Sequence, residues 1–294
     1  MNSPLIHIGY PKSGTTWFQN NFYPNVKNAG YIPRKNVQDH IIRPYAIGFD
    51  ATESIRFFNR GQDKTIIICE ELLLASVRSG GFNGFVTKEI GNRLKLIFPN
   101  ALIVIFIRNQ VDLIASAYGQ YIKGGGREGI DEYLFHSKAK FYIDLFQFSF
   151  KYLEYDRILS FYQGLFGENL YIFPFEKFAS NRIGFLSDFA KKFQLDIDLE
   201  ELDLEPKNKR LNTTSYIRWR NRLRIPAKLS VSNITGGRLN HESIFMKRKS
   251  PEEILGNKNT DYIKQYYKES NQKLIDLFGL EDIREFGYPL DPVQ

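Results

Sequence analysis

Residues 10–17, which read YPKSGTTW, combine the side chains that proteins use to bind anions. Lys12 supplies a mobile positive charge, and Gly14 allows the backbone to approach a ligand closely. Hydroxyl groups that can donate hydrogen bonds to a phosphate or sulfate belong to Ser13, Thr15 and Thr16. The stretch is not a Walker loop, because its lysine precedes the glycine. It therefore predicts a nucleotide site, but not that of an ordinary ATPase.

A second candidate anion site begins at Arg108, which directly follows an apolar run. The guanidinium of Arg108 is a fixed, forked charge that suits phosphate, and the hydroxyl of Ser116 follows eight residues later. An alternative interpretation makes Arg108 the ion-pair partner of Asp112 and Ser116 a small packing residue. Taken alone, this stretch does not separate the two interpretations.

Two adjacent carboxylates, Glu70 and Glu71, follow another apolar run and are candidates for a general base. Glu70 is the first choice because it directly follows the run, and Glu71 is the second. A neighbouring carboxylate and a desolvated cleft would raise the pKa of such a base. The alternative is that one of the pair caps the next helix or binds a lysine. No cluster of His, Cys, Asp and Glu has the spacing of metal ligands, so we expect no metal.

These groups need a scaffold, and the apolar pattern of the chain predicts an α/β fold with a central parallel sheet. Four nearly continuous apolar runs are typical of strands that are buried on both faces, at residues 5–9, 65–69, 102–107 and 170–173. Predicted helices lie at residues 15–22, 91–98, 111–122, 141–150, 157–166, 184–193 and 260–278. We expect Asp156 to cap the fifth helix, and Ser180 or Asn181 the sixth. Ligands of such sheets bind beyond the carboxyl ends of the strands, where all the candidate residues fall.

Two segments, 24–63 and 203–258, show little periodicity, and we expect them to be irregular walls or a lid of an acceptor cleft. The length of 294 residues fits one large α/β domain or two small ones. We interpret residues 1–294 as a single domain.

The net charge of +7 is concentrated between residues 207 and 228, which hold eight basic residues and no acidic one. This segment is either a solvated basic face or a contact for phosphates, an acidic acceptor or a membrane surface. No apolar run is long enough to cross a bilayer, and no cleavable leader opens the chain. With a single cysteine, Cys69, these features predict a cytoplasmic protein, with contact to the inner face of a membrane as an open alternative.

Residues 10–17 resemble the 5′-phosphosulfate loop of the sulfotransferases, and Arg108 to Ser116 resemble their 3′-phosphate motif. The two motifs occur in the family's order, and each follows a predicted strand. Residues 266–274 and 286–289 also resemble the ending of many bacterial members. The resemblance spans most of the chain and is weakest in its middle.

The resemblance implies a P-loop-like three-layer fold and the sulfuryl donor 3′-phosphoadenosine-5′-phosphosulfate (PAPS), with no metal. The residues that it assigns to the 5′-phosphate are Lys12, Ser13, Gly14, Thr15 and Thr16. Arg108 and Ser116 would bind the 3′-phosphate. Trp17 matches a family aromatic residue near the adenine, although a core position explains it equally well.

Glutamate after the second predicted strand points to one branch of the family. Cytosolic members with small-molecule acceptors have a histidine there, whereas carbohydrate-modifying members often use a glutamate as base. The resemblance therefore implies sulfation of a hydroxyl, with a saccharide or glycolipid as acceptor and Glu70 or Glu71 as base.

Three other functions remain as alternatives. A P-loop kinase would need the Walker lysine, which is absent from residues 10–17. A nucleic-acid-binding protein would use the 207–228 segment but would leave both phosphate motifs unexplained, so nucleic acid is not the expected partner. A sulfotransferase-like protein without catalysis would not need Lys12 and Glu70. The acceptor and the oligomeric state are not encoded in these patterns.

Overall fold

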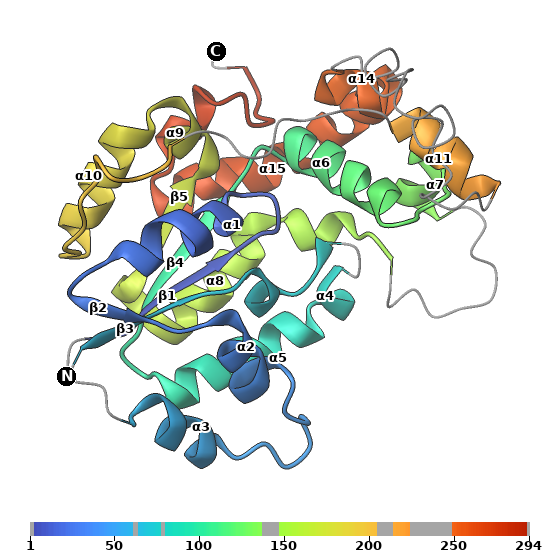
Figure 1. The fold of residues 1–294 in the computed structure, drawn as a ribbon. Helices are drawn as coiled ribbons and strands as arrows, with labels where there is room; N and C mark the ends of the chain where they lie inside the picture. The colour runs from blue at the N-terminus through green and yellow to red at the C-terminus, as the bar shows by residue number, and fades with distance from the viewer. Residues whose placement is uncertain are drawn as a thin grey trace, which may run out of the picture.

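A five-stranded parallel sheet forms the centre of the computed structural model (Figure 1). The structure describes residues 3–60, 64–77, 80–136, 147–204, 214–223 and 249–292. In sheet order the strands are β2 (Ala29–Tyr31), β3 (Thr65–Cys69), β1 (Leu5–Gly9), β4 (Leu102–Ile107) and β5 (Leu170–Pro174). All four neighbouring pairs are parallel, which confirms the predicted α/β architecture.

The order of the strands brings the predicted site residues to one edge. The central strand β1 pairs with β3 on one side and β4 on the other, with Leu5 opposite both Ile67 and Leu102. Because all three strands run the same way, the residues that follow them emerge at the same edge of the sheet. The anion loop, the glutamate pair and Arg108 are therefore neighbours in space.

Alternating side chains of the strands enter two separate cores, which makes the fold three-layered. On one face, Ile6, Ile68 and Ile105 pack with the helices that follow β3 and β4 and with the C-terminal helix. On the other face, Leu5, Ile67 and Phe106 join an aromatic cluster supplied by residues 18–23 and 178–193. Strands buried on both faces explain the continuous apolar runs in the sequence.

Helices surround the sheet on both faces (Figure 1). The α-helices are α1 (Thr15–Trp17), α2 (Arg34–Val37), α3 (Ala51–Phe58), α4 (Gly80–Asn83), α5 (Phe85–Ile97), α6 (Gln110–Lys123), α7 (Ile130–Phe135), α8 (Tyr155–Phe166), α9 (Phe175–Ser180), α10 (Arg182–Lys192), α11 (Thr214–Arg222), α14 (Pro251–Leu255) and α15 (Asn257–Phe278). Short 3-10 or π segments are η1 (Phe18–Phe22), η2 (Tyr23–Asn25), η3 (Gln38–Ile42), η4 (Glu71–Leu74), η6 (Phe150–Leu153), η7 (Gly167–Asn169) and η9 (Glu281–Arg284). No helix among the described residues is long and apolar enough to span a bilayer.

The expectation that residues 24–63 are irregular is wrong. This segment holds the edge strand β2 and the short helices α2, η3 and α3. Each element is only three to eight residues long, so the window is too short for a clear period. Of the 203–258 segment, the structure describes α11, α14 and a few other residues. Most of the predicted helix 141–150 lies outside the described residues.

One helix cap is as predicted and one differs. The Asn181 side chain accepts a hydrogen bond from the Gly184 N–H and caps α10. Asp156 does not cap α8, because this helix starts at Tyr155, two residues before the predicted start, and has Glu154 at the N-cap position.

Candidate active site

Lys12 lies at the turn between β1 and α1 in a left-handed backbone conformation, with φ of 75°. Such a conformation is uncommon for a side-chain-bearing residue and is typical of ligand-binding loops. Burial lowers the pKa of the Lys12 ammonium. The positive charges of Lys123 and Arg108 lower this pKa further, whereas the Glu71 carboxylate opposes them. A desolvated lysine with two further cations close by is suited to an anionic ligand.

The loop residues that follow Lys12 add hydrogen-bond donors to the site. The N–H groups of Thr15 and Thr16 open α1 and have no acceptor within the helix. The buried Ser13 hydroxyl donates to the Tyr10 carbonyl, which fixes the turn. The Thr15 side chain is buried, whereas that of Thr16 is exposed. The start of α1 therefore offers backbone donors and one exposed hydroxyl.

Gly14 leaves little room for a side chain and has a backbone conformation that favours glycine. Its φ is 93°, and a Cβ at this position would lie 3.1 Å from the Phe175 ring. The same ring lies under the Arg108 guanidinium, with the Arg108 Cζ 5.0 Å from the ring centroid. Phe175, the first residue of α9, thus contacts both the anion loop and Arg108.

We expect Gly14→Ala to destabilise the protein by about 1–3 kcal/mol, because it strains the backbone and crowds Phe175. Thermal melting measures the effect, and titration with 3′-phosphoadenosine-5′-phosphate (PAP) tests whether the loop still binds a nucleotide. Gly48→Ala is the matched control, because Gly48 also has positive φ, at 79°, but no atom lies within 4 Å of the place that a methyl group would take. Equal losses in the two variants would contradict a specific role for the Gly14–Phe175 contact.

Arg108 joins the two predicted anion sites. It lies at the end of β4, is buried, and its Nη1 donates a hydrogen bond of 2.7 Å to the Lys12 carbonyl oxygen. The Tyr155 hydroxyl donates to the Arg108 carbonyl oxygen at 2.6 Å, which fixes the backbone at this point. Residues 96 positions apart in the chain are thereby in direct contact.

A polar network braces the residues that follow Arg108. The backbone N–H of Asn109 donates to Glu176 Oε1 at 3.0 Å, and the Tyr288 hydroxyl donates to Glu176 Oε2 at 3.0 Å. The Asn109 side-chain amide donates to the Gly287 carbonyl oxygen at 2.6 Å. Burial raises the pKa of Glu176, and these hydrogen bonds oppose the rise. The C-terminal residues that resemble the bacterial members thus support the Arg108 loop.

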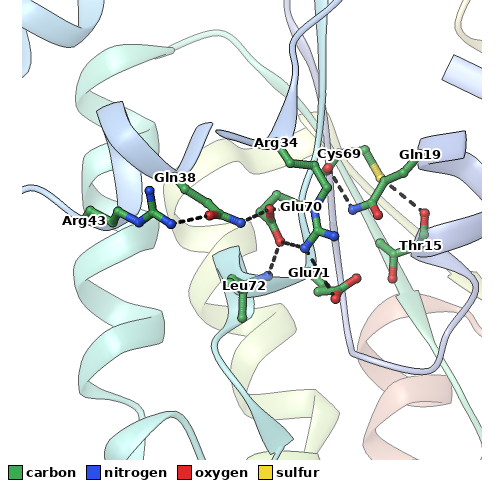
Figure 2. Close-up of polar contacts among 9 residues, drawn as sticks. All are labelled: Thr15, Gln19, Arg34, Gln38, Arg43, Cys69, Glu70, Glu71 and Leu72. Atoms are coloured by element: carbon green, nitrogen blue, oxygen red, sulfur yellow. Dashed lines mark hydrogen bonds and ion pairs between the residues drawn. The ribbon is translucent and has the colours of Figure 1, made fainter. Parts of the chain in front are cut away.

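Glu70, the first candidate base, has both carboxylate oxygens occupied (Figure 2). Arg34 donates from Nε and Nη2, at 2.9 Å each. Gln38 Nε2 donates at 3.0 Å, and the Leu72 N–H donates at 3.1 Å as Glu70 caps η4. The side chain is 0% exposed. This geometry favours a structural role for Glu70 rather than proton transfer.

Glu71, the second candidate, lies beside the anion loop and is partly open. Its side chain is 25% exposed, and Oε1 is 3.6 Å from Arg34 Nη2. Burial raises the pKa of Glu71, and Arg34 is the largest influence that lowers it. The Lys12 charge and a hydrogen bond with Thr15 also lower this pKa. The two glutamates therefore differ in exposure, and only Glu71 has room for a further partner.

Trp17 and Ser116 complete the set of predicted site residues. Trp17 is half-buried, packs on Phe178 with ring centroids 5.1 Å apart, and donates from Nε1 to the Asp203 carbonyl oxygen at 3.2 Å. Ser116 is half-buried in α6, two turns beyond Arg108. Their contacts with a nucleotide remain predictions.

Sequence reasoning missed several residues of this site. Phe175 and Glu176 directly follow β5, and the rule that placed the other site residues after strands would have found them. Arg34 lies on α2, in a segment with too little periodicity to read. Lys123 is the last residue of α6, and its charge lowers the pKa of Lys12.

No family model and no curated protein matches the sequence. A sulfotransferase from Alicyclobacillus acidocaldarius has a similar structure, with a TM-score of 0.51 at 16% sequence identity over 83% of this chain and 99% of that chain. Mouse sulfotransferase SULT7A1 complexed with PAP matches over 98% of this chain and 90% of its own, at 11% identity, with a TM-score of 0.48 that is too low to add weight. The first similarity shows that this chain has a sulfotransferase fold.

Proposed function

We propose that this chain is a PAPS-dependent sulfotransferase that transfers a sulfuryl group to an acceptor hydroxyl. The observation that carries the proposal is the hydrogen bond from Arg108 Nη1 to the Lys12 carbonyl oxygen. This bond joins two elements at the ends of adjacent strands that we propose to bind the 5′ and 3′ phosphates of one nucleotide. The donor, the acceptor and the base are parts of the proposal, which the sulfotransferase fold supports.

In the proposed reaction, the bond between sulfur and the bridging oxygen of PAPS breaks as the acceptor oxygen bonds to sulfur. Negative charge develops on the 5′-phosphate of the departing PAP, by analogy with phosphoryl transfer. Lys12 and the N–H groups at the start of α1 are positioned to stabilise this charge. The acceptor proton passes to a carboxylate.

We assign the base to Glu71 rather than to Glu70. Glu71 is partly exposed and lies close enough to Lys12 for their charges to interact. Both oxygens of Glu70 accept hydrogen bonds from the protein, so an incoming hydroxyl would have to displace one of them. A base beside the loop that holds the sulfuryl group needs no such displacement.

A saccharide or glycolipid is the proposed acceptor, with residues of the 24–63 and 203–258 segments as cleft walls. In support, α11 lies along α6, where the Asn221 amide donates to the carbonyl oxygens of Ile122 and Gly126 at 2.8 and 2.9 Å. The part of the basic 207–228 segment that the structure describes is thus next to the helix that bears Ser116. We propose a cytoplasmic location, with contact to an anionic acceptor or a membrane surface through this segment.

Calorimetry with PAP and with ADP tests the donor class. PAP carries the 3′-phosphate that ADP lacks, so we expect wild-type protein to bind PAP roughly 10- to 100-fold more tightly, the effect of a charged hydrogen-bond partner. Arg108→Ala is expected to remove most of this preference. Equal affinities of wild-type protein for the two nucleotides would end the sulfotransferase interpretation.

Arg182→Ala is the matched control for Arg108→Ala. Arg182 also lies over a phenylalanine ring, with its Cζ 5.5 Å from the Phe178 centroid, and also donates to a backbone carbonyl, that of Leu204. It follows β5 by way of α9 and is not part of the anion loop. We expect it to keep the preference for PAP.

Transfer of labelled sulfate to a panel of glycans then identifies the acceptor.

A further inference from the structure

Glu70 and Arg34 form a rigid unit at the end of β3. Arg34 presents two parallel N–H groups to the two oxygens of Glu70, which is the strongest geometry available to this pair. Gln38 adds a third donor, and its amide is itself oriented by Arg43, whose Nη2 donates to Gln38 Oε1 at 2.9 Å. A buried carboxylate needs such compensation, because its desolvation is costly.

The Arg34 side chain nevertheless reaches the candidate active site. It is 40% exposed, whereas Glu70 is fully buried. Its Nη2, which already donates to Glu70, is 3.6 Å from Glu71 Oε1 (Figure 2). One guanidinium nitrogen thus lies between a buried, fully bonded carboxylate and a partly open one.

We propose that Arg34 is a positioning residue for the reaction: the buried Glu70 clamps its guanidinium, which in turn holds the Glu71 carboxylate beside the anion loop. Glu70 then acts as the anchor of this arrangement rather than as a base. The proposal rests on the assignment of Glu71 as the proton acceptor. Sulfuryl transfer needs only one base, and the proposal explains why two adjacent glutamates are present.

Charged and polar groups from several elements face Glu71. Arg34 comes from α2, Glu70 from the end of β3, and Lys12 and Thr15 from the turn and first residues of α1. Arg34 and Lys12 favour the ionised form of Glu71, and Glu70 disfavours it. Burial also disfavours the ionised form. Arg34 keeps Glu71 available to accept a proton at neutral pH and fixes where it points.

NMR titration of labelled glutamate side chains in the free protein measures this effect without an acceptor. The Glu71 resonance is assigned by its loss in Glu71→Gln. In Arg34→Gln we expect the pKa of Glu71 to rise by about one unit, the usual effect of an opposite charge at this distance. Arg34→Lys, which keeps the charge, is expected to restore part of the difference. No rise in Arg34→Gln would overturn the proposal.

Arg34→Gln leaves Glu70 buried without its cation and can fail to fold. The double variant Arg34→Gln/Glu70→Gln removes both charges and keeps the shape of the pair. Because Arg34 influences Glu71 more strongly than Glu70 does, we expect a smaller rise in the pKa of Glu71. An unchanged or lower pKa in the double variant contradicts the proposal.

Lys35→Gln is the matched control, because Lys35 neighbours Arg34 on α2 but is exposed and pairs with Asp39. It should leave the pKa of Glu71 unchanged. PAP affinity in the same proteins separates the two proposals. If wild-type protein binds PAP no more tightly than ADP, the sulfotransferase function is refuted. If PAP binding is normal but the pKa of Glu71 does not change in Arg34→Gln, only the role of Arg34 is refuted.

Discussion

Replacing Lys12 with methionine is expected to lower the rate of sulfuryl transfer by about 10²- to 10³-fold, the usual effect of losing one group that stabilises a developing charge. Methionine keeps most of the side-chain volume and meets the same constraint at φ of 75° as lysine does, so the variant removes the charge without adding backbone strain. We expect PAP affinity to fall much less than the rate, because the N–H groups of α1 and Arg108 remain. Single-turnover transfer and calorimetry with PAP measure the two quantities.

The pKa of Lys12 adds a pH signature to this prediction. Because burial lowers that pKa, Lys12 loses its proton at a lower pH than an exposed lysine does. The rate should therefore fall on the alkaline side in wild-type protein, and this fall should be absent from the residual rate of Lys12→Met. Lys123→Met is the control, because Lys123 is an exposed neighbour of the same type. A similar loss of rate in both variants would mean that general electrostatic attraction, rather than Lys12 itself, supports transfer.

Replacing Glu71 with glutamine is expected to reduce turnover by about 10²- to 10⁴-fold, the range for a missing general base. The amide keeps the shape of the side chain but cannot accept the acceptor proton. Burial raises the pKa of Glu71, so wild-type activity should decline as the pH falls through a value above the usual glutamate pKa of about 4.3. Activity is present above this pKa and lost below it. Turnover with the acceptor found in the glycan panel, measured against pH, checks both statements.

Glu70→Gln is the comparison that separates the two glutamates. It removes the charge of the buried Glu70 from an ion pair whose other member, Arg34, is 40% exposed. The loss of charge-assisted hydrogen bonds is expected to cost about 1.5–3 kcal/mol of stability. We expect a lower melting temperature, and a smaller loss of turnover than in Glu71→Gln at a temperature where both variants are folded. The reverse order of turnover would restore Glu70 as the base.

Most of the sheet could be predicted from the sequence because β1, β3 and β4 are buried on both faces. The ranges 5–9, 65–69 and 102–107 agree with β1, β3 and β4 residue for residue, and only the end of β5 differs, by one residue. Strands of this kind need apolar residues at every position, which leaves a continuous run. The edge strand β2 has only three residues, Ala29–Tyr31, two of which are partly exposed, and it pairs with β3 alone. Its sequence therefore contains no continuous apolar run.

The candidate site was predictable only where its residues directly follow such strands. Lys12 and Arg108 were found from their position and chemistry, and the structure brings them into contact. The preference for Glu70 over Glu71 came from position alone, and sequence does not show which of two adjacent carboxylates is covered. That outcome depends on Arg34, whose contact with Glu70 spans 36 positions of the chain and is made by an element without a readable pattern.

The hydrogen bonds that hold Asn109 link the Arg108 loop to the order in which the chain is synthesised. Asn109 is fixed by the Gly287 carbonyl oxygen, 178 positions later, and by Glu176, which also bonds Tyr288. The strands of the sheet and the loop at Lys12 all precede residue 175, so they are synthesised long before residues 287 and 288. The loop that carries Arg108 becomes fully braced only when these residues have emerged. We therefore expect the loop that carries Arg108 to be one of the last parts of the fold to reach its final conformation.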